Sequence, residues 1–131
     1  MIVDASAVIA ILRDEPEARS CAQAIASARN RRISAVNYVE ASVVIDGSRD
    51  PIASRRFDDL LRAAQLTIEP VTAAQARIAR EAYRDFGKGA GHRAGLNFGD
   101  CFAYALAKVT GEPILFKGDD FTHTDLTRAI E

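Results

Sequence analysis

The chain has 131 residues, of which 48% are hydrophobic and 27% charged, a balance typical of one globular domain spanning residues 1–131. Its 17 basic and 18 acidic side chains give a formal net charge of −1, which excludes a highly basic nucleic-acid-binding domain. No apolar stretch approaches the ~20 residues of a membrane span and the start lacks signal-peptide features, so we expect a cytoplasmic protein.

The first half of the chain predicts two strands and three helices. β-branched residues at positions 2 and 3 favour a short buried strand over residues 1–4. Side chains of the type that cap helices, Ser6 and Asn37, precede two of the predicted helices. The elements expected in order are the strand 1–4, helix 7–12, helix 17–28, strand 33–36 and a helix from Asn37 to Asp46.

The second half continues the alternation of strands and helices. Pro51 is expected in a turn, Thr72 and Asn97 as helix caps, and Gly87 and Gly111 as helix ends. The predicted elements are helix 53–65, strand 66–71, a helix from 72 to 87, a glycine-rich loop 88–95, a helix from 97 to 111 and strand 113–116. This pattern predicts an α/β fold, a three-layer α/β/α sandwich with a small parallel sheet.

Acidic residues recur where strands end or helices begin. Asp4 ends the first strand, and Asp119 and Asp120 follow the last one. Glu40 and Asp100 each lie three residues after a predicted asparagine cap. Ligands and catalytic groups in parallel sheets gather at the carboxyl ends of strands, so these acids are candidates for one site.

Taken singly, each acid has a purely structural explanation. Glu40 and Asp100 could be helix-start residues, Asp4 could cap a helix, and Asp119–Asp120 could form a turn. Taken together, carboxylates at one sheet edge repel one another and call for a cation. Oxygen ligands of this kind suit Mg²⁺ or Mn²⁺, and such a site hydrolyses phosphodiester bonds with the aid of metal-activated water.

Four segments resemble the PIN domain, specifically the VapC-type toxin ribonucleases of bacterial toxin–antitoxin systems. They are MIVDASA at the start, SAVNYVEAS around Glu40, HRAGLNFGDCFAYALAK around Asp100 and PILFKGDDFTHTD near the end. The resemblance covers essentially the whole chain. It implies a small parallel sheet between helices and an endoribonuclease that uses Mg²⁺ or Mn²⁺ and leaves a 5′ phosphate.

The resemblance also implies roles for individual residues. The first three family acids fall on Asp4, Glu40 and Asp100, and Ser6 matches a hydroxyl that assists metal or water positioning. Asp4 and Asp100 would hold the metal directly, and Glu40 would bind metal or orient water. The fourth acid falls on Asp120, with Asp119 as the alternative, because two aspartates occupy the place where many relatives have a threonine–x–aspartate.

Two protein partners follow from the same resemblance. The chain is expected to form a homodimer, and a cognate VapB-type antitoxin is expected to fill the groove near the acids and inhibit cleavage. The RNA substrate needs cations near the acidic edge. The candidates are Lys88, His92 and Arg93 in the glycine-rich loop, and Lys117 beside the last strand, although solvated surface charges explain them equally well.

Two other functions stay open from the sequence. A catalytically inactive PIN-like binding module would have the same fold without metal. An aspartyl-nucleophile phosphatase also places an aspartate after its first strand, but it needs a second aspartate two residues later, where this chain has Ser6. Metal-dependent stabilisation separates an active site from an inactive module.

Overall fold

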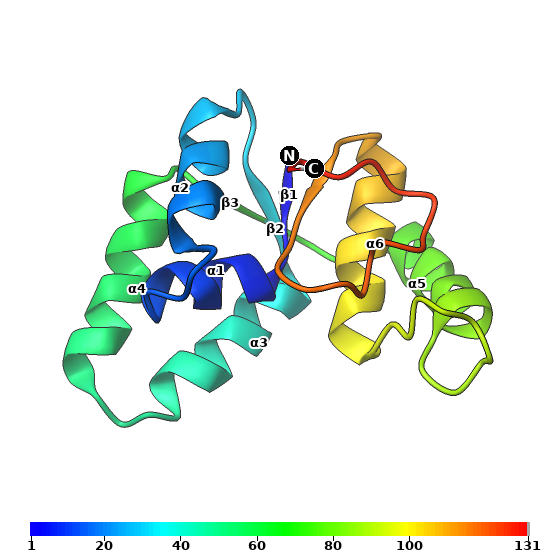
Figure 1. The fold of residues 1–131 in the computed structure, drawn as a ribbon, viewed down its shortest axis with the longest axis horizontal. Coiled ribbons are helices and arrows are strands. Elements are labelled where there is room, and N and C mark those ends of the chain that lie inside the picture. The colour runs from blue at the N-terminus through cyan, green and yellow to red at the C-terminus, as the bar shows by residue number, and fades with distance from the viewer. Residues whose placement is uncertain (131) are drawn as a thin grey trace.

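The computed structural model describes residues 1–130 and shows helices on both sides of a short sheet (Figure 1). The strands in these residues are β1 (Ile2–Val3), β2 (Arg32–Ser34), β3 (Thr67–Glu69) and β4 (Ile114–Leu115). The helices are α1 (Ala5–Leu12), α2 (Ala18–Ser27), α3 (Ala35–Asp46), α4 (Pro51–Ala63), α5 (Ala73–Phe86) and α6 (Phe98–Thr110). The expected α/β sandwich with a small parallel sheet is confirmed.

The four strands are parallel and lie in the order β3-β2-β1-β4. From β1 the chain adds β2 and then β3 on one side, and only the last strand joins the other side. β1 and β4 are neighbours in this order and pair with Ile2 opposite Ile114 and Val3 opposite Leu115. The connections therefore reverse between β1 and β4, which is where open parallel sheets of this kind bind their ligands.

Two hydrophobic cores fill the spaces on the two faces of the sheet. Val3 and Leu115 point into a core shared with α1 to α4, whereas Ile2 and Ile114 point into a core shared with α5 and α6. Successive residues of a strand face opposite sides, so each two-residue strand contributes one side chain to each core. Figure 1 shows the corresponding division, with α1, α2 and α4 on one side of the strands and α5 and α6 on the other.

Two of the predicted helix caps are wrong. Asp4, not Ser6, caps α1, because its carboxylate accepts a hydrogen bond from the Ser6 backbone N–H at 3.0 Å. Ser34, not Asn37, caps α3, and its hydroxyl accepts from the N–H of Val36. β2 consequently ends at Ser34 instead of continuing to position 36, and Asn37 becomes a fully buried residue within α3.

The later boundaries agree better with the sequence pattern. Thr72 and Asn97 cap α5 and α6 through side-chain bonds to backbone N–H groups, and Gly111 ends α6 in the left-handed conformation. Pro51 is the exception, because it opens α4 after the cap Asp50 instead of forming a turn. Over residues 1–130, none of the helices has the length and apolar character needed to cross a membrane.

Candidate active site

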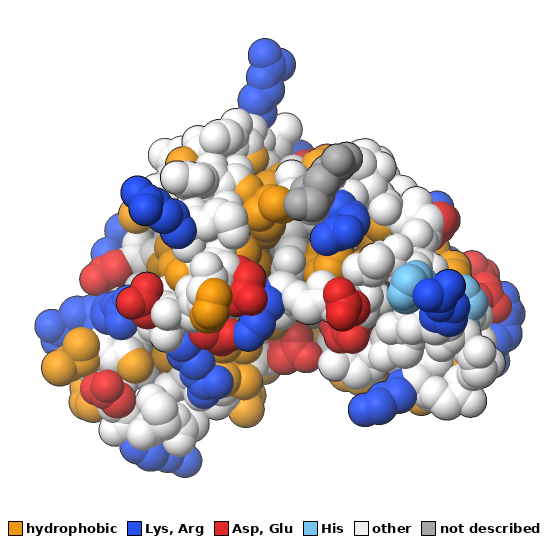
Figure 2. Space-filling view, viewed as in Figure 1, with side chains coloured by type: hydrophobic (Ala, Val, Ile, Leu, Met, Phe, Trp, Pro, Cys, Tyr) orange, Lys and Arg blue, Asp and Glu red, His pale blue; other side chains and the backbone are white. Residues whose placement is uncertain are grey.

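A pocket of about 220 Å³ opens beside the carboxyl ends of β1 and β4, at the point where the strand connections reverse. We call it the acid pocket because four of its lining residues are carboxylates: Asp4, Glu40, Asp100 and Asp120. The other lining residues are Ala5, Ser6, Ile9, Val44, Asn97, Lys117 and Phe121. Figure 2 shows acidic side chains on both sides of the hollow between the two halves of the molecule. Four separate segments of the chain thus supply acids to one place.

Asp4 lies deepest of the four acids, with only 4% of its surface exposed. Its Oδ2 atom accepts hydrogen bonds from the backbone N–H and the hydroxyl of Ser6, the latter at 2.6 Å. Its Oδ1 atom is buried and has no hydrogen-bond partner in the described residues. Burial raises the pKa of Asp4, and repulsion from Asp120 adds to this rise. One buried carboxylate oxygen is therefore free to bind an external group.

Asp100 is fixed by the start of α6. Its carboxylate accepts from the backbone N–H of Asn97 at 3.0 Å, while the Asn97 side chain accepts from the Asp100 N–H at 2.9 Å. This reciprocal pair is a capping box, so the structural explanation of Asp100 is correct and coexists with its place in the pocket.

The electrostatic surroundings of Asp100 are unfavourable for a charged carboxylate. Burial raises the pKa of Asp100 to about 8, and the hydrogen bond from Asn97 opposes this rise. Repulsion from Asp4 and Asp120 contributes to the raised pKa of Asp100. A cation bound beside these acids would favour their charged form and so oppose the rise in pKa.

Glu40 reaches the pocket from the second turn of α3, across from the start of α6. Its carboxylate accepts a hydrogen bond from Asn37 Nδ2 at 3.3 Å, and the same amide donates to the carbonyl oxygen of Gly99 at 2.9 Å. A Cβ atom at Gly99 would overlap the Glu40 carboxylate, so only glycine at position 99 leaves room for the carboxylate where it lies. Burial raises the pKa of Glu40, and the charge of Asp4 adds to the rise.

Asp120 comes from the loop after β4 and is exposed to solvent. The next residue, Phe121, is fully buried and its ring packs against Phe116 at 5.1 Å between centroids. This anchor directs Asp120 into the pocket, whereas Asp119 is exposed and does not line the pocket.

Lys117 contacts the pocket through its backbone N–H, whereas its ammonium group pairs with acids outside the pocket. Its N–H donates to the Ser6 hydroxyl at 2.9 Å, so Ser6 connects Asp4 to the loop after β4. Its ammonium group forms an ion pair with Glu15 and lies 3.9 Å from Glu17. Although Lys117 lines the pocket, the four acids form no ion pair with it or with another cation of residues 1–130.

The three residues of the glycine-rich loop that were predicted to contact RNA, Lys88, His92 and Arg93, do not line the acid pocket. Lys88 lines a neighbouring groove, where its carbonyl oxygen accepts from the Tyr83 hydroxyl at 3.2 Å. His92 folds back on Phe86 with an edge-on contact of 4.9 Å, and its Nδ1 accepts from the N–H of Ala94. Arg93 is exposed. Their contact with RNA stays a prediction.

The donor set of the acid pocket fits a hard divalent cation. It offers carboxylate oxygens, one of them buried without a partner, and carboxyl groups whose pKa values are raised by burial and by one another. As placed here, however, no three acidic, histidine or cysteine groups of residues 1–130 are close enough to bind one ion together.

Two residues that shape the pocket were not identified from the sequence. Asn37 was expected to cap a helix, yet it bridges α3 to α6 and orients Glu40. Gly99 was not singled out, although its position within the NFGD segment, beside a predicted site acid, was the available signal. Both depend on a contact between α3 and α6 that no local pattern encodes.

Comparison with known proteins places this geometry in a family context. The PIN domain family model matches residues 1–126. Ribonuclease VapC28 of Mycobacterium tuberculosis is 56% identical over 131 residues, covering 100% of this chain and 98% of that protein. Ribonuclease VapC42 of the same species is 50% identical over 129 residues, covering 98% of both chains.

Two solved structures have the same fold at much lower identity. Mycobacterium tuberculosis VapC20, described as a sarcin-ricin loop cleaving toxin, has a TM-score of 0.71 at 16% identity and covers 96% of this chain and 95% of its own. A toxin-antitoxin complex from Klebsiella pneumoniae has a TM-score of 0.70 at 16% identity, covering 95% and 92% of the two chains.

Proposed function

Because this chain belongs to the PIN domain family and, within it, to the VapC ribonucleases, we propose that it is an endoribonuclease toxin that hydrolyses RNA phosphodiester bonds in the acid pocket. The observation that carries the proposal is the convergence of Asp4, Glu40, Asp100 and Asp120 on one pocket, where none of the four pairs with a cation of residues 1–130. Such an arrangement costs stability unless a bound ion compensates for it.

We assign the cofactor as Mg²⁺, with Mn²⁺ as the alternative. Bound beside the acids, the ion supplies positive charge that lowers the pKa of water and stabilises the leaving oxygen of the RNA. Asp4 and Asp100 are the residues that would hold it directly, because they are the two most buried acids of the pocket and Asp4 has a free oxygen.

The remaining residues orient these groups and the attacking water. Glu40 is held against α6 by Asn37, so its carboxylate is positioned to accept a proton from water on that side. Asp120 lies at the solvent side of the pocket, close enough to Asp100 to raise its pKa, a position suited to the outer part of the site. Ser6 keeps Asp4 in place by donating its hydroxyl hydrogen to Oδ2.

Two protein partners are part of the proposal. A VapB-type antitoxin would inhibit the enzyme by placing a cationic side chain among the unpaired acids of the pocket. A second copy of the chain would cover the apolar side chains that α3 leaves in water, Val39 and Val43, which are 55% and 67% exposed. A cytoplasmic location, where RNA and such an antitoxin are available, stays a prediction.

The direct test is cleavage of total cellular RNA by the purified protein, followed by sequencing of the new 5′ ends. We expect cuts with Mg²⁺ or Mn²⁺ and none with EDTA. The Asp4→Asn variant keeps an oxygen that can cap α1, so it serves as a folded control for contaminating nucleases. Equal cutting by Asp4→Asn and wild type would contradict the proposal.

A metal titration separates an active site from an inactive binding module of the same fold. Saturating Mn²⁺ at 100 times its dissociation constant should stabilise the folded protein by about 2.7 kcal/mol, and Asp4→Asn should lose most of this effect. Thermal denaturation measures both. A protein that cleaves no RNA and gains no stability from either metal would be the inactive module.

A further inference from the structure

Lys117 is the basic residue among those that line the acid pocket, and its backbone is tied to Asp4 through Ser6. Its N–H donates to the Ser6 hydroxyl at 2.9 Å, and that hydroxyl donates to Asp4 Oδ2 at 2.6 Å. A lysine carries its charge at the end of a long, flexible stem. Rotation of this stem would therefore bring the ammonium group towards the carboxylates of the pocket that Lys117 lines.

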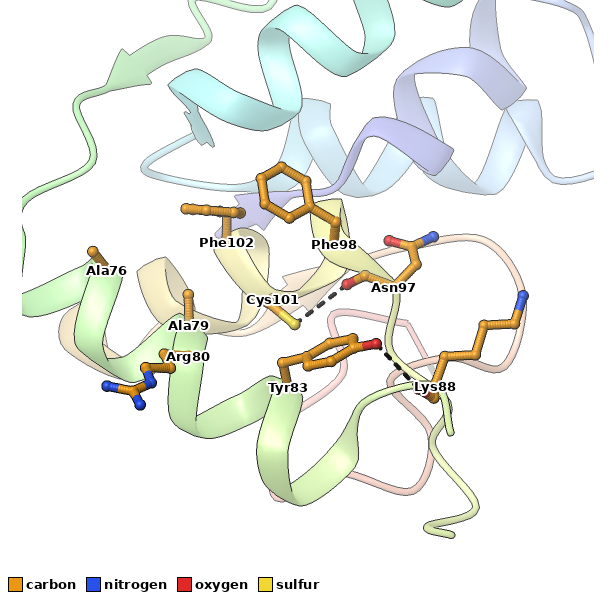
Figure 3. A pocket seen from close by; sticks show the side chains of 9 residues that line it. All are labelled: Ala76, Ala79, Arg80, Tyr83, Lys88, Asn97, Phe98, Cys101 and Phe102. Carbon is orange, nitrogen blue, oxygen red and sulfur yellow. Dashed lines mark hydrogen bonds between the residues drawn. The ribbon is translucent and has the colours of Figure 1, made fainter. Parts of the chain in front are cut away.

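The cations of the neighbouring groove belong to a different pocket. Figure 3 shows Arg80 and Lys88 among the residues of the groove between α5 and α6, which shares only Asn97 with the acid pocket. Among the described residues that line the acid pocket, Lys117 alone could therefore neutralise its acids from within the chain.

The ammonium group of Lys117 nevertheless pairs with acids outside the pocket. It forms an ion pair with Glu15 and lies 3.9 Å from Oε2 of Glu17. This Glu17 oxygen is buried and has no hydrogen-bond partner within residues 1–130. The hydrogen bond to Glu15, together with the charges of Glu15 and Glu17, raises the pKa of Lys117. Two glutamates thus hold the one cation that could pair with the acids of the pocket.

The turn between α1 and α2 fixes the positions of these two glutamates. The backbone N–H of Glu15 donates to the carbonyl oxygen of Ala10 at 2.9 Å, and the carbonyl oxygen of Glu15 accepts from the N–H of Ala18 at 2.9 Å. Pro16 lies between the two glutamates, and its ring fixes φ at that position. The glutamates are therefore carried by a restricted segment of backbone.

We propose that Glu15 is a positioning residue, which withholds the Lys117 ammonium group from the acid pocket and so leaves the pocket to a divalent cation. This inference rests on the proposed ribonuclease function. An ammonium group attached to the chain loses no translational freedom when it meets a carboxylate, whereas an ion from solution does. Lys117 released from Glu15 would therefore compete with the metal, and the apparent dissociation constant would rise as the fraction of open pockets falls.

The test measures metal binding by the full-length protein, with Mn²⁺ alone as the probe. The electron paramagnetic resonance signal of free Mn²⁺ gives the dissociation constant. Glu15→Gln keeps the size of the side chain and removes its charge. It should weaken Mn²⁺ binding about 10-fold, the loss expected if the ammonium group occupies the pocket for about nine-tenths of the time. Glu17→Gln should weaken it less, because the Glu17 carboxylate lies farther from the ammonium group.

A double variant separates the positioning role from other effects of Glu15. Lys117→Met keeps a long, unbranched side chain without a charge, so Glu15→Gln/Lys117→Met should bind Mn²⁺ as tightly as Lys117→Met alone. If Glu15 acted only through the fold, or only through its own negative charge, Glu15→Gln would weaken binding equally in both backgrounds. Such an equal loss, or an unchanged affinity of Glu15→Gln in the wild-type background, would overturn the inference.

Asp14→Asn is the matched control for charge. Asp14 is exposed beside Glu15 and forms no ion pair within residues 1–130. Its φ of 51° lies in the left-handed region, which asparagine tolerates. The substitution removes the same charge from the same turn and should leave the Mn²⁺ affinity unchanged. A loss as large as that of Glu15→Gln would show that only the net charge of the turn matters, which would also overturn the inference.

Cleavage gives a second readout, because excess metal relieves competition. Glu15→Gln should need about 10-fold more Mg²⁺ for half-maximal cutting, yet it should approach the wild-type rate at saturation. Mg²⁺-dependent cutting with the same metal requirement in Glu15→Gln and wild type would leave the ribonuclease intact and refute the positioning role. Weakened Mn²⁺ binding that Lys117→Met rescues, in a protein that cuts no RNA, would support the positioning role and refute the enzyme.

Discussion

Acids near the two ends of the strands have opposite electrostatic surroundings. We call the side of the sheet where the strands begin the amino edge and the side where they end the carboxyl edge. At the amino edge, where the strands begin, Arg32 donates to Glu112 at 2.8 Å, and the ammonium group of Met1 also pairs with Glu112. Arg32 also donates at 2.9 Å to Glu69, the last residue of β3. Burial alone would raise the pKa of Glu112, but the charge and hydrogen bonds of Met1 and Arg32 hold it below the ordinary value. Glu112 is therefore neutralised by the chain itself.

At the carboxyl edge the acids of the pocket have no such partners. The pKa values of Asp4, Glu40 and Asp100 are raised, first by burial and then by other acids of the pocket. Lys117, the basic residue that lines the pocket, pairs with Glu15 instead. The same sheet therefore contains acids that stabilise the fold and acids that oppose it, and the second kind is expected where an external cation acts.

The substitution Asp100→Asn should have the largest effect on cleavage, and it tests whether the acids of the carboxyl edge are catalytic. Cleavage should fall at least about 100-fold, the usual loss when one electrostatic group of an active site is removed. The cap should survive, because the asparagine oxygen can still accept from the Asn97 N–H. Initial rates of RNA cutting in Mg²⁺ measure the effect, and near-normal cutting would remove Asp100 from the site.

The same variant should be more stable than wild type when metal is removed. A carboxyl with a raised pKa stabilises the fold while protonated, below its ordinary pKa of 3.8, and this contribution is lost as pH rises towards about 8. In EDTA at pH 8, Asp100→Asn should therefore melt about 3–10 °C higher and show a flatter decline of stability between pH 4 and pH 8. A lower melting temperature would mean that Asp100 acts chiefly as a cap.

At the amino edge, Glu112→Gln should have the opposite result. Losing the charge that Met1 and Arg32 share should reduce the free energy of unfolding by about 1–2 kcal/mol and leave cleavage unchanged. A lowered pKa gives stability that is present above the ordinary value of 4.5 and is lost as pH falls, so the difference from wild type should disappear in acid. Urea denaturation at pH 7 and pH 3 measures this, and a loss of cleavage would contradict the separation of the two edges.

The sequence predicts the fold well because its signals are local. Apolar periodicity and glycine ends locate the helices, and their alternation with short strands leads to a parallel sheet. The error at α3 has a physical reason. Ser34 and Asn37 both can cap a helix, and the choice depends on a distant partner, since Asn37 finds the carbonyl of Gly99 across the interface.

The pairing of charges was harder to predict than the positions of the acids. Strand ends and helix starts, with the family resemblance favouring Asp120 over Asp119, identified the four acids that line the pocket, although their catalytic role stays a prediction. Arg31 and Arg32, in contrast, have partners that no local pattern of the sequence indicates. Arg32 pairs with two glutamates, and Arg31 donates to the carbonyls of Ile25, Ala26 and Ala64. Which acid meets which cation depends on loop paths that residue spacing does not give.

The smallest predicted effect tests how closely the carboxyl edge must be packed. In Gly99→Ala the new methyl group would overlap the Glu40 carboxylate, which is the end of a flexible side chain and can move away. The fold should survive within about 1 kcal/mol, while cleavage should fall about 10-fold because water is no longer held on the Glu40 side. Gly111→Ala is the control: it also replaces a glycine of the α6 termini, and although its left-handed backbone is strained, no atom lies within 4 Å of the added Cβ. That variant should lose stability but not its rate of cutting at a temperature where it is folded. Equal rates for Gly99→Ala and wild type would show that the position of Glu40 is not set by this contact, and the acid pocket would then be defined by β1, β4 and α6 alone.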